Sequence, residues 1–275
     1  MFHGSPVGFS NSVAFFPRLP AASSNFSSSD AVIAQLAVAG GKLAYEQEKL
    51  DNFEIGIKWT GLDNRLRVIV DGYYGKWKNG QVSQSIFVTQ TNGALAAMSV
   101  ILNQGAVDLK GLEAEARWAT TDKLTLGGTL AYMKNEVKNY LDVVNGPRVY
   151  GSNNAAGYEL PGAPKLTFSL SADYQDHFMG DWDWFARTDV TYRGGFFIDT
   201  HDIAKTAPAT RMNLRAGLES GGIRVEGYVN NVFDNDEITE AGIAMDTISA
   251  NAAQNAIRFI APTKRQFGVK ASYRF

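Results

Sequence analysis

The strict alternation of apolar and polar residues along a series of long segments constrains this chain most. In residues 166–174, Leu, Phe, Leu, Ala and Tyr alternate with Thr, Ser, Ser and Asp, and residues 124–132 and 211–218 alternate in the same way. Successive side chains of a β-strand point to opposite faces, so each segment predicts a strand with one apolar and one polar face. About ten such segments follow one another by this rule: 53–59, 65–77, 82–88, 107–119, 124–137, 165–174, 182–194, 210–218, 223–234 and 266–275.

The connections between these segments are alternately short and long. The short ones are rich in Gly, Asp and Asn, which tight hairpin turns require; they are 60–64, 120–123, 175–181 and 219–222. The long ones are polar and cover roughly 79–106, 140–163, 195–209 and 235–264. This order predicts antiparallel strands that run up and down, with every long loop at the same end. Helix is expected only in short pieces, near 31–40 or within 240–256.

Strand length and aromatic placement distinguish a membrane protein from a soluble sandwich, in which rows also alternate. Many segments reach about nine residues, enough to span a bilayer, whereas soluble strands usually have about five or six. Aromatic rings stand near the ends of the apolar rows, where a bilayer interface favours them: Tyr74, Trp118, Tyr132, Tyr174, Trp182 and Tyr192. The predicted fold class is all-β, an antiparallel up-and-down transmembrane β-barrel.

The composition excludes several classes of protein. The 275 residues include 26 Lys and Arg against 28 Asp and Glu, and the formal net charge of −2 does not favour nucleic acid as a partner. The absence of Cys removes disulfides, thiolate metal sites and cysteine nucleophiles. No apolar run reaches the ~18 residues of a transmembrane helix. The first residues do not form a secretory signal, which fits a cytosolic protein or a chain whose natural start is missing.

A series of short motifs follows a recognisable order along the chain. The motifs are YEQEKLDNFEIGIKW (45–59), RLRVIVDGYYGKWKN (65–79), NQGAVDLKGLEAEARW (103–118), TDKLTLGGTLAYMKNEV (121–137), LPGAPKLTFSLSADY (160–174), YVNNVFD (228–234) and the terminal YRF. Together they resemble the C-terminal half of the barrel of TonB-dependent outer-membrane receptors. The resemblance covers 45–275 and leaves 1–44 unmatched.

The resemblance implies a division of the chain and a position within a larger barrel. Residues 53–275 would supply barrel strands, and residues 1–52 would be a loop-rich N-terminal segment, the remnant of an extracellular loop or of an earlier strand. The family's barrel has about 22 strands around an N-terminal plug domain, so the chain would be its C-terminal part, without the plug. Strands taken from a wider barrel are expected to form an open sheet with two exposed edges.

The resemblance also implies a function, which is transport and not enzymatic catalysis. It implies energy-coupled uptake of a scarce ligand, such as an iron-siderophore complex, across the outer membrane of a Gram-negative bacterium. The implied partners are outer-membrane lipid, the barrel assembly machinery, the ligand, and TonB through a plug domain that this chain lacks. A self-contained porin-like barrel for passive diffusion and a soluble β-sheet binding protein remain alternatives. A hydrolase is disfavoured, because the chain has few His residues.

The titratable residues do not form a catalytic or metal-binding pattern, and no cofactor is expected. Glu113 and Glu115 share a strand face, but such carboxylates in a barrel wall usually belong to an interior charge ladder, with partners such as Arg117 or Lys123. The three His residues are far apart in sequence and do not match a metal-ligand spacing. The polar rows at 185–193 and 211–215 mix both signs of charge, as expected for a lumen wall.

Two groups of residues are candidate functional sites. Asp199, His201 and Asp202 lie in a long loop and could contact a ligand at the loop mouth. Phe267, Tyr273 and Phe275 lie on the apolar row of the last segment, which would end at the periplasmic interface. The resemblance implies that this aromatic ending is also the signal that the assembly machinery recognises.

Overall fold

The computed structural model describes residues 45–89, 95–103, 105–141, 150–238, 240–245 and 255–275. Within these ranges the chain forms thirteen β-strands and no helix. The strands are β1 (Lys49–Gly61), β2 (Leu66–Lys78), β3 (Gln81–Thr89), β4 (Leu95–Asn103), β5 (Ala106–Ala119), β6 (Leu124–Asn139), β7 (Leu166–Met179), β8 (Trp182–Arg193), β9 (Ala209–Ser220), β10 (Ile223–Asn230), β11 (Ala241–Met245), β12 (Asn255–Phe259) and β13 (Gln266–Tyr273).

The chain divides into two compact units. One comprises Asp51–Lys76, Val107–Val137 and Gly157–Phe275 and carries the main sheet. The other includes Trp77–Ala106 and Lys138–Ala156, and in it β3 and β4 pair antiparallel, residue for residue, from Gln81↔Asn103 to Thr89↔Leu95.

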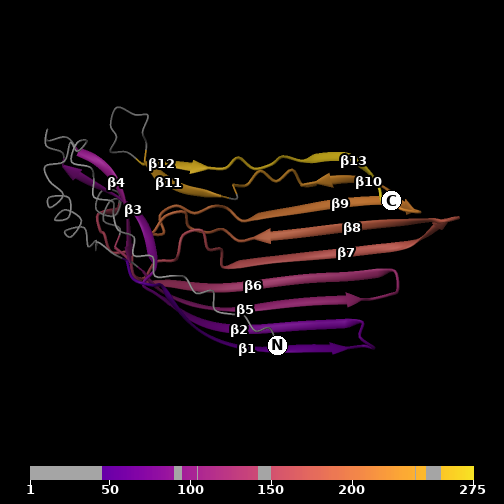
Figure 1. The fold of residues 1–275 in the computed structure, drawn as a ribbon, viewed down its shortest axis with the longest axis horizontal. Helices are drawn as coiled ribbons and strands as arrows, with labels where there is room; N and C mark the ends of the chain where they lie inside the picture. Colours follow the sequence, from indigo (N-terminus) through magenta and orange to yellow (C-terminus); the bar gives the residue numbers. More distant parts are fainter. Residues whose placement is uncertain (1–44, 90–94, 104, 142–149, 239, 246–254) are drawn as a thin grey trace. The chain divides into compact units, whose positions relative to one another are not determined.

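The main sheet has nine strands in the order β1-β2-β5-β6-β7-β8-β9-β10-β13 (Figure 1). Its strands from β6 onward pair antiparallel with their neighbours. β1 and β13 are its two edges and do not pair with each other, so the nine strands form an open sheet. The expected all-β, open antiparallel architecture is therefore confirmed.

The tight turns of this sheet lie at one end, as expected from the sequence (Figure 1). Between β1 and β2 the chain turns through Leu62, Asp63 and Asn64, whose φ angles are 52°, 53° and 66°. Between β9 and β10 the turn is Gly221-Gly222, with φ angles of 53° and 87°. Two successive positive φ angles match the right-handed twist of a two-residue hairpin, and glycine adopts them without a steric penalty.

The strand register places the two rows of each strand on opposite faces of the sheet. Between β10 and β13, Val225 lies opposite Ala271 on the apolar face, and Arg224 lies opposite Ser272 on the polar face. A slip of one residue would exchange the faces of a whole strand, so the pattern determines the register. Apolar side chains stay exposed on the outer face; Leu170 on β7, for example, is 55% exposed.

The structure corrects several expected boundaries. Residues 95–103 form β4 instead of loop, and the loop expected at 235–264 contains the β11–β12 hairpin. That hairpin also contradicts the helix expected within 240–256 for the described residues there, whereas 31–40 lies outside the described residues. The alternation pattern did not predict β4, because LAAMSVILN does not alternate between apolar and polar residues with a period of two.

Two strand ends also differ from the expectation. β7 continues to Met179 through a register shift between His177 and Met179, which leaves a turn much shorter than 175–181. β10 stops at Asn230 because Asn231 takes a left-handed φ of 53° and its buried side-chain amide donates to the carbonyls of Asn235 and Thr263.

Candidate functional site

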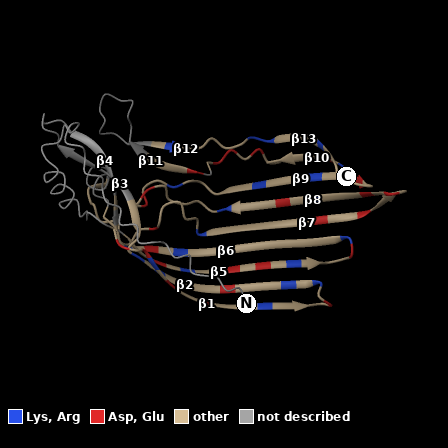
Figure 2. Cartoon of the chain, in the orientation of Figure 1, with Lys and Arg blue, Asp and Glu red and all other residues tan. Residues whose placement is uncertain are grey.

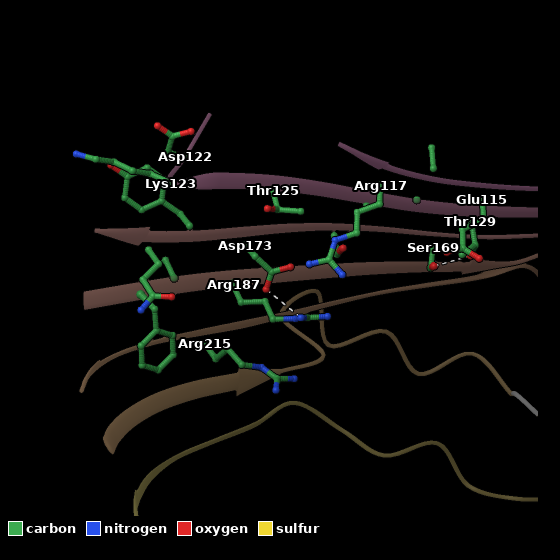
Figure 3. A pocket seen from close by; sticks show the side chains of 18 of the residues that line it. Glu115, Arg117, Asp122, Lys123, Thr125, Thr129, Ser169, Asp173, Arg187 and Arg215 are labelled. Carbon is green, nitrogen blue, oxygen red and sulfur yellow. Dashed lines mark hydrogen bonds and ion pairs between the residues drawn. The ribbon is translucent and has the colours of Figure 1, made fainter. Parts of the chain in front are cut away.

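The polar rows of β5 to β10 line a groove on the inner face of the sheet. Its volume is about 690 Å³, and its lining residues come from six successive strands and the β5–β6 turn (Figure 3). Charged residues of both signs lie along these strands (Figure 2). The alternation of the sequence produces this wall, because every second residue of each strand points into it.

Arg187 on β8 is the centre of an ion-pair network in this groove (Figure 3). Its Nη1 lies 2.9 Å from Asp173 on the neighbouring β7, and its Nη2 lies 2.8 Å from Asp189, two residues along its own strand. Arg215 on β9 reaches the same Asp189 at 3.6 Å. The side chains are partly exposed, so the network neutralises a wetted wall and contributes modestly to stability.

A second cluster forms where Phe185 lies against Gly217, its partner across β8 and β9. A Cβ added to Gly217 would be 2.7 Å from the Phe185 ring, so only glycine lets the ring lie flat on this strand. The Arg224 guanidinium lies 3.7 Å from the centre of that ring and forms ion pairs with Glu219 and Glu226, at 3.0 Å and 3.2 Å. This cation–π contact contributes about 0.5–2 kcal/mol.

The charge ladder expected around Glu113 and Glu115 is wrong in one partner. Lys123, in the β5–β6 turn, binds Asp176 of β7 at 2.8 Å, and its pKa is raised because the carboxylate stabilises the ammonium. The sequence could not indicate this pair, because 53 positions separate the two residues and only the β6–β7 register brings them together.

The three loop candidates lie in the connection between β8 and β9, and two of them are buried. Asp199 is 4% exposed, and its carboxylate accepts backbone N–H groups of His201 at 2.9 Å, Ile203 at 3.1 Å and Ala204 at 2.7 Å. The Asp199 side chain therefore stabilises the conformation of the loop in which it lies. His201 is also 4% exposed; its ring lies 5.3 Å from that of Tyr158, and its Nδ1 is 3.0 Å from the Thr200 hydroxyl.

Asp202 ties this loop to the segment that precedes β7. Both of its carboxylate oxygens accept the backbone N–H of Glu159, at 3.2 Å. Burial raises the pKa of Asp202, and the charges of Glu159 and Asp199 raise it further. The structure thus brings Asp199, His201 and Asp202 together in one tethered loop, and their contact with a ligand stays a prediction.

The segment before β7 is held by residues that no sequence motif indicated as functional. Asn135 of β6 is 2% exposed, and its amide oxygen accepts the backbone N–H of Leu160. Glu159 forms an ion pair with Lys165. The sequence carried no signal for Asn135, because its burial is seen only in the folded chain, where the buried amide needs hydrogen-bond partners.

The aromatic residues of the last strand are exposed on the apolar face. Phe267 is 81% exposed, Tyr273 is 65% exposed, and Phe275 follows the end of β13. The rings of Tyr273 and Phe275 lie 6.4 Å apart. Their exposure is consistent with a surface that contacts lipid, and their role as an assembly signal stays a prediction.

The described residues do not contain a group of three or more His, Cys, Asp and Glu that could hold a metal ion. In the described ranges, no helix is both long and apolar enough to cross a membrane. Several charges of the inner wall are paired, among them Arg187 with Asp173 and Asp189, and Arg224 with Glu219 and Glu226.

An open antiparallel sheet of long strands, apolar on its outer face and charged on its inner face, has the architecture of a β-barrel wall. The chain belongs to the TonB dependent receptor-like β-barrel family, whose model matches residues 12–232. This match begins at residue 12, within the segment 1–44 that the sequence motifs left unmatched.

Solved structures of receptors share this fold. The ferric yersiniabactin uptake receptor FyuA from Yersinia pestis is 17% identical, with a TM-score of 0.63 over 84% of this chain and 30% of that chain. The siderophore receptor PiuA from Acinetobacter baumannii is 17% identical, with a TM-score of 0.61 over 84% of this chain and 29% of that one. The copper transporter OprC is 19% identical, with a TM-score of 0.59 over 86% of this chain and 33% of that one.

The chain therefore spans about a third of the length of these receptors or less. No curated protein matches the sequence.

Proposed function

We propose that this chain forms one side of the barrel wall of a TonB-dependent receptor in the outer membrane of a Gram-negative bacterium. The receptor takes up a scarce ligand such as an iron-siderophore complex, and TonB drives the uptake through a plug domain. The observation that carries this proposal is the open nine-stranded sheet with a charged inner face, in a chain of the receptor family. One of the similar structures is named a ferric yersiniabactin uptake receptor and another a siderophore receptor.

In this function the two faces of the sheet have separate roles. The outer rows contact lipid, which suits exposed side chains such as Ile55, 81% exposed, and Val269, 77% exposed. The inner network around Arg187 lines a water-filled or plugged lumen. Residues 49–275 supply the strands, since β1 begins at Lys49 and not at the expected residue 53. The aromatic ending is read by the barrel assembly machinery, and the residues before Lys49 remain a separate loop-rich segment.

Energy coupling distinguishes this function from a porin. The gene would be deleted in its host, and uptake of radiolabelled ferric siderophores would be measured with and without an uncoupler of the inner membrane. We expect the deletion to abolish the uptake of one chelate, and the uncoupler to abolish it in the wild type. Uptake that depends on the gene but resists the uncoupler would favour passive diffusion, and uptake that is indifferent to the gene would refute the proposal.

A further inference from the structure

The connection between β8 and β9, residues 194–208, folds on itself. The backbone N–H of Ile198 donates to the carbonyl of Ala204, and that of Thr206 donates to the carbonyl of Phe196, both over 2.9 Å. The side chains of Phe196 and Ile198 are buried, at 6% and 9% exposure. A loop with buried apolar side chains and its own hydrogen bonds resists local opening, whereas most loops lie at the low-stability end of a structure.

This β8–β9 loop also holds the segment that precedes β7. The Asp202 carboxylate accepts the backbone N–H of Glu159 through both of its oxygens. The carbonyl of Phe197 accepts the backbone N–H of Gly162 over 2.9 Å. Two separate points of the loop therefore fix the same segment, and both depend on the shape of the loop.

Arg193, the last residue of β8, joins the loop to a third segment. Its Nη1 donates to the Thr206 hydroxyl over 3.1 Å, and its Nη2 donates over 2.9 Å to the carbonyl of Ile238, in the connection that follows β10. The centre of its guanidinium lies 4.7 Å from the centre of the Phe196 ring. The β8–β9 loop is therefore joined to the neighbouring connection on each side of it in the sheet order.

Asp199 supports this arrangement from inside the loop. Its carboxylate is buried and accepts the backbone N–H groups of His201, Ile203 and Ala204. Among the described residues, the hydrogen bonds of this carboxylate all go to its own loop. A charged acceptor forms stronger hydrogen bonds than a neutral one, so Asp199 determines the conformation from which the loop reaches its neighbours.

We propose that the β8–β9 loop is a fixed hub, which holds the segments before β7 and after β10 in place, and that Asp199 is its positioning residue. Segments that share buried side chains and hydrogen bonds open together as one cooperative unit. A ligand that reaches these loops meets a preformed surface, and not a lid that must close. The inference rests on the loop geometry alone and holds whether or not the chain takes part in uptake.

The test is residue-resolved hydrogen–deuterium exchange of the purified full chain, folded in detergent micelles. The reporters are the amides of Glu159 and Gly162, whose acceptors lie in the β8–β9 loop. The reference amides belong to the same segment: Gly157 and Leu160 donate to acceptors on β6 and not to the loop. A change that passes through the hub therefore affects two amides of this segment and leaves the other two unchanged.

The main variant is Asp199→Ala, which removes the shared acceptor without touching the segment before β7. Its matched control is Ile203→Ala in the same loop, where the side chain is 72% exposed. If Asp199→Ala loses its β-sheet circular dichroism, Asp202→Gly and Asp202→Asn replace it. Both residues tolerate the left-handed φ of 57° at this position, and only asparagine retains an acceptor for the Glu159 N–H.

We expect Asp199→Ala to speed exchange at Glu159 and Gly162 by about tenfold or more, because buried hydrogen bonds to a charged acceptor are lost. Gly157 and Leu160 should stay within about twofold, as should all four amides in Ile203→Ala. Asp202→Gly should speed both reporters, and Asp202→Asn should restore them.

Three results would overturn the proposal. The first is a change confined to amides within 194–208, which would mean that the loop does not hold its neighbour. The second is equal acceleration of all four amides in the segment before β7, which would show general loosening and no hub. The third is wild-type exchange at Glu159 and Gly162 as fast as in an unstructured peptide.

Discussion

Replacing Gly217 by alanine tests the close approach of the β10 backbone to β9. The new Cβ would lie 2.2 Å from the carbonyl oxygen of Val225 and 2.9 Å from the Cα of Glu226, both on the backbone of β10. Carbon and carbonyl oxygen normally approach to about 3.3 Å, so β9 and β10 would have to separate by roughly 1 Å. The Phe185 ring, 2.7 Å from the same Cβ, would also be displaced. Overpacking of this kind costs about 1–3 kcal/mol.

The control is Gly227→Ala on the adjacent strand, where an added Cβ meets no atom within 4 Å. Alanine there restricts the unfolded chain and should raise the free energy of unfolding by about 0.5 kcal/mol. Both variants would be unfolded in urea in detergent micelles, with tryptophan fluorescence as the signal, which the 5 Trp residues of the chain provide.

We expect Gly217→Ala to be at least about 1 kcal/mol less stable than Gly227→Ala, because both substitutions restrict the unfolded chain equally and only Gly217→Ala overpacks the sheet. Equal midpoints and slopes for the two variants would refute the reasoning, because they would mean that β9 and β10 tolerate a side chain between them without cost.

Three further predictions concern charge and assembly. Burial raises the pKa of Asp202, so the folded chain holds this proton more tightly than the unfolded chain; the resulting stability is present at low pH and is lost as pH rises from about 3.8 through the raised pKa. Asp202→Asn should remove that pH dependence in unfolding curves, and an unchanged curve would contradict it. Arg187→Gln should lower the free energy of unfolding by about 0.5–1 kcal/mol in the same urea assay, because the ion pairs that it removes are partly exposed and screened by solvent; an unchanged free energy of unfolding would count against the network. Deleting Phe275 in the complete receptor should sharply lower its amount in the outer membrane on immunoblots, whereas Arg274→Ala should not; equal amounts for the deletion and the wild type would exclude an assembly role.

The sequence by itself determined the local features of this protein. Alternation predicted which residues of 166–174 and 211–218 face outward, and the Gly-rich or Asp-rich stretches predicted the tight turns, because both depend on neighbours within a few positions. The same rows predicted a charged inner wall, and the ion pairs around Arg187 confirm it.

The tertiary structure decided what depends on register between distant segments. Lys123 reaches Asp176 and Phe185 lies on Gly217 only because particular strands pair at particular positions. Asp199 looked like a solvated loop residue in the sequence, yet it is buried, because the loop folds its own N–H groups around the carboxylate. Periodicity describes one strand at a time, whereas an ion pair or a buried side chain is a property of at least two segments. The interaction free energy between the segments depends on both of them, so neither segment's sequence predicts it alone.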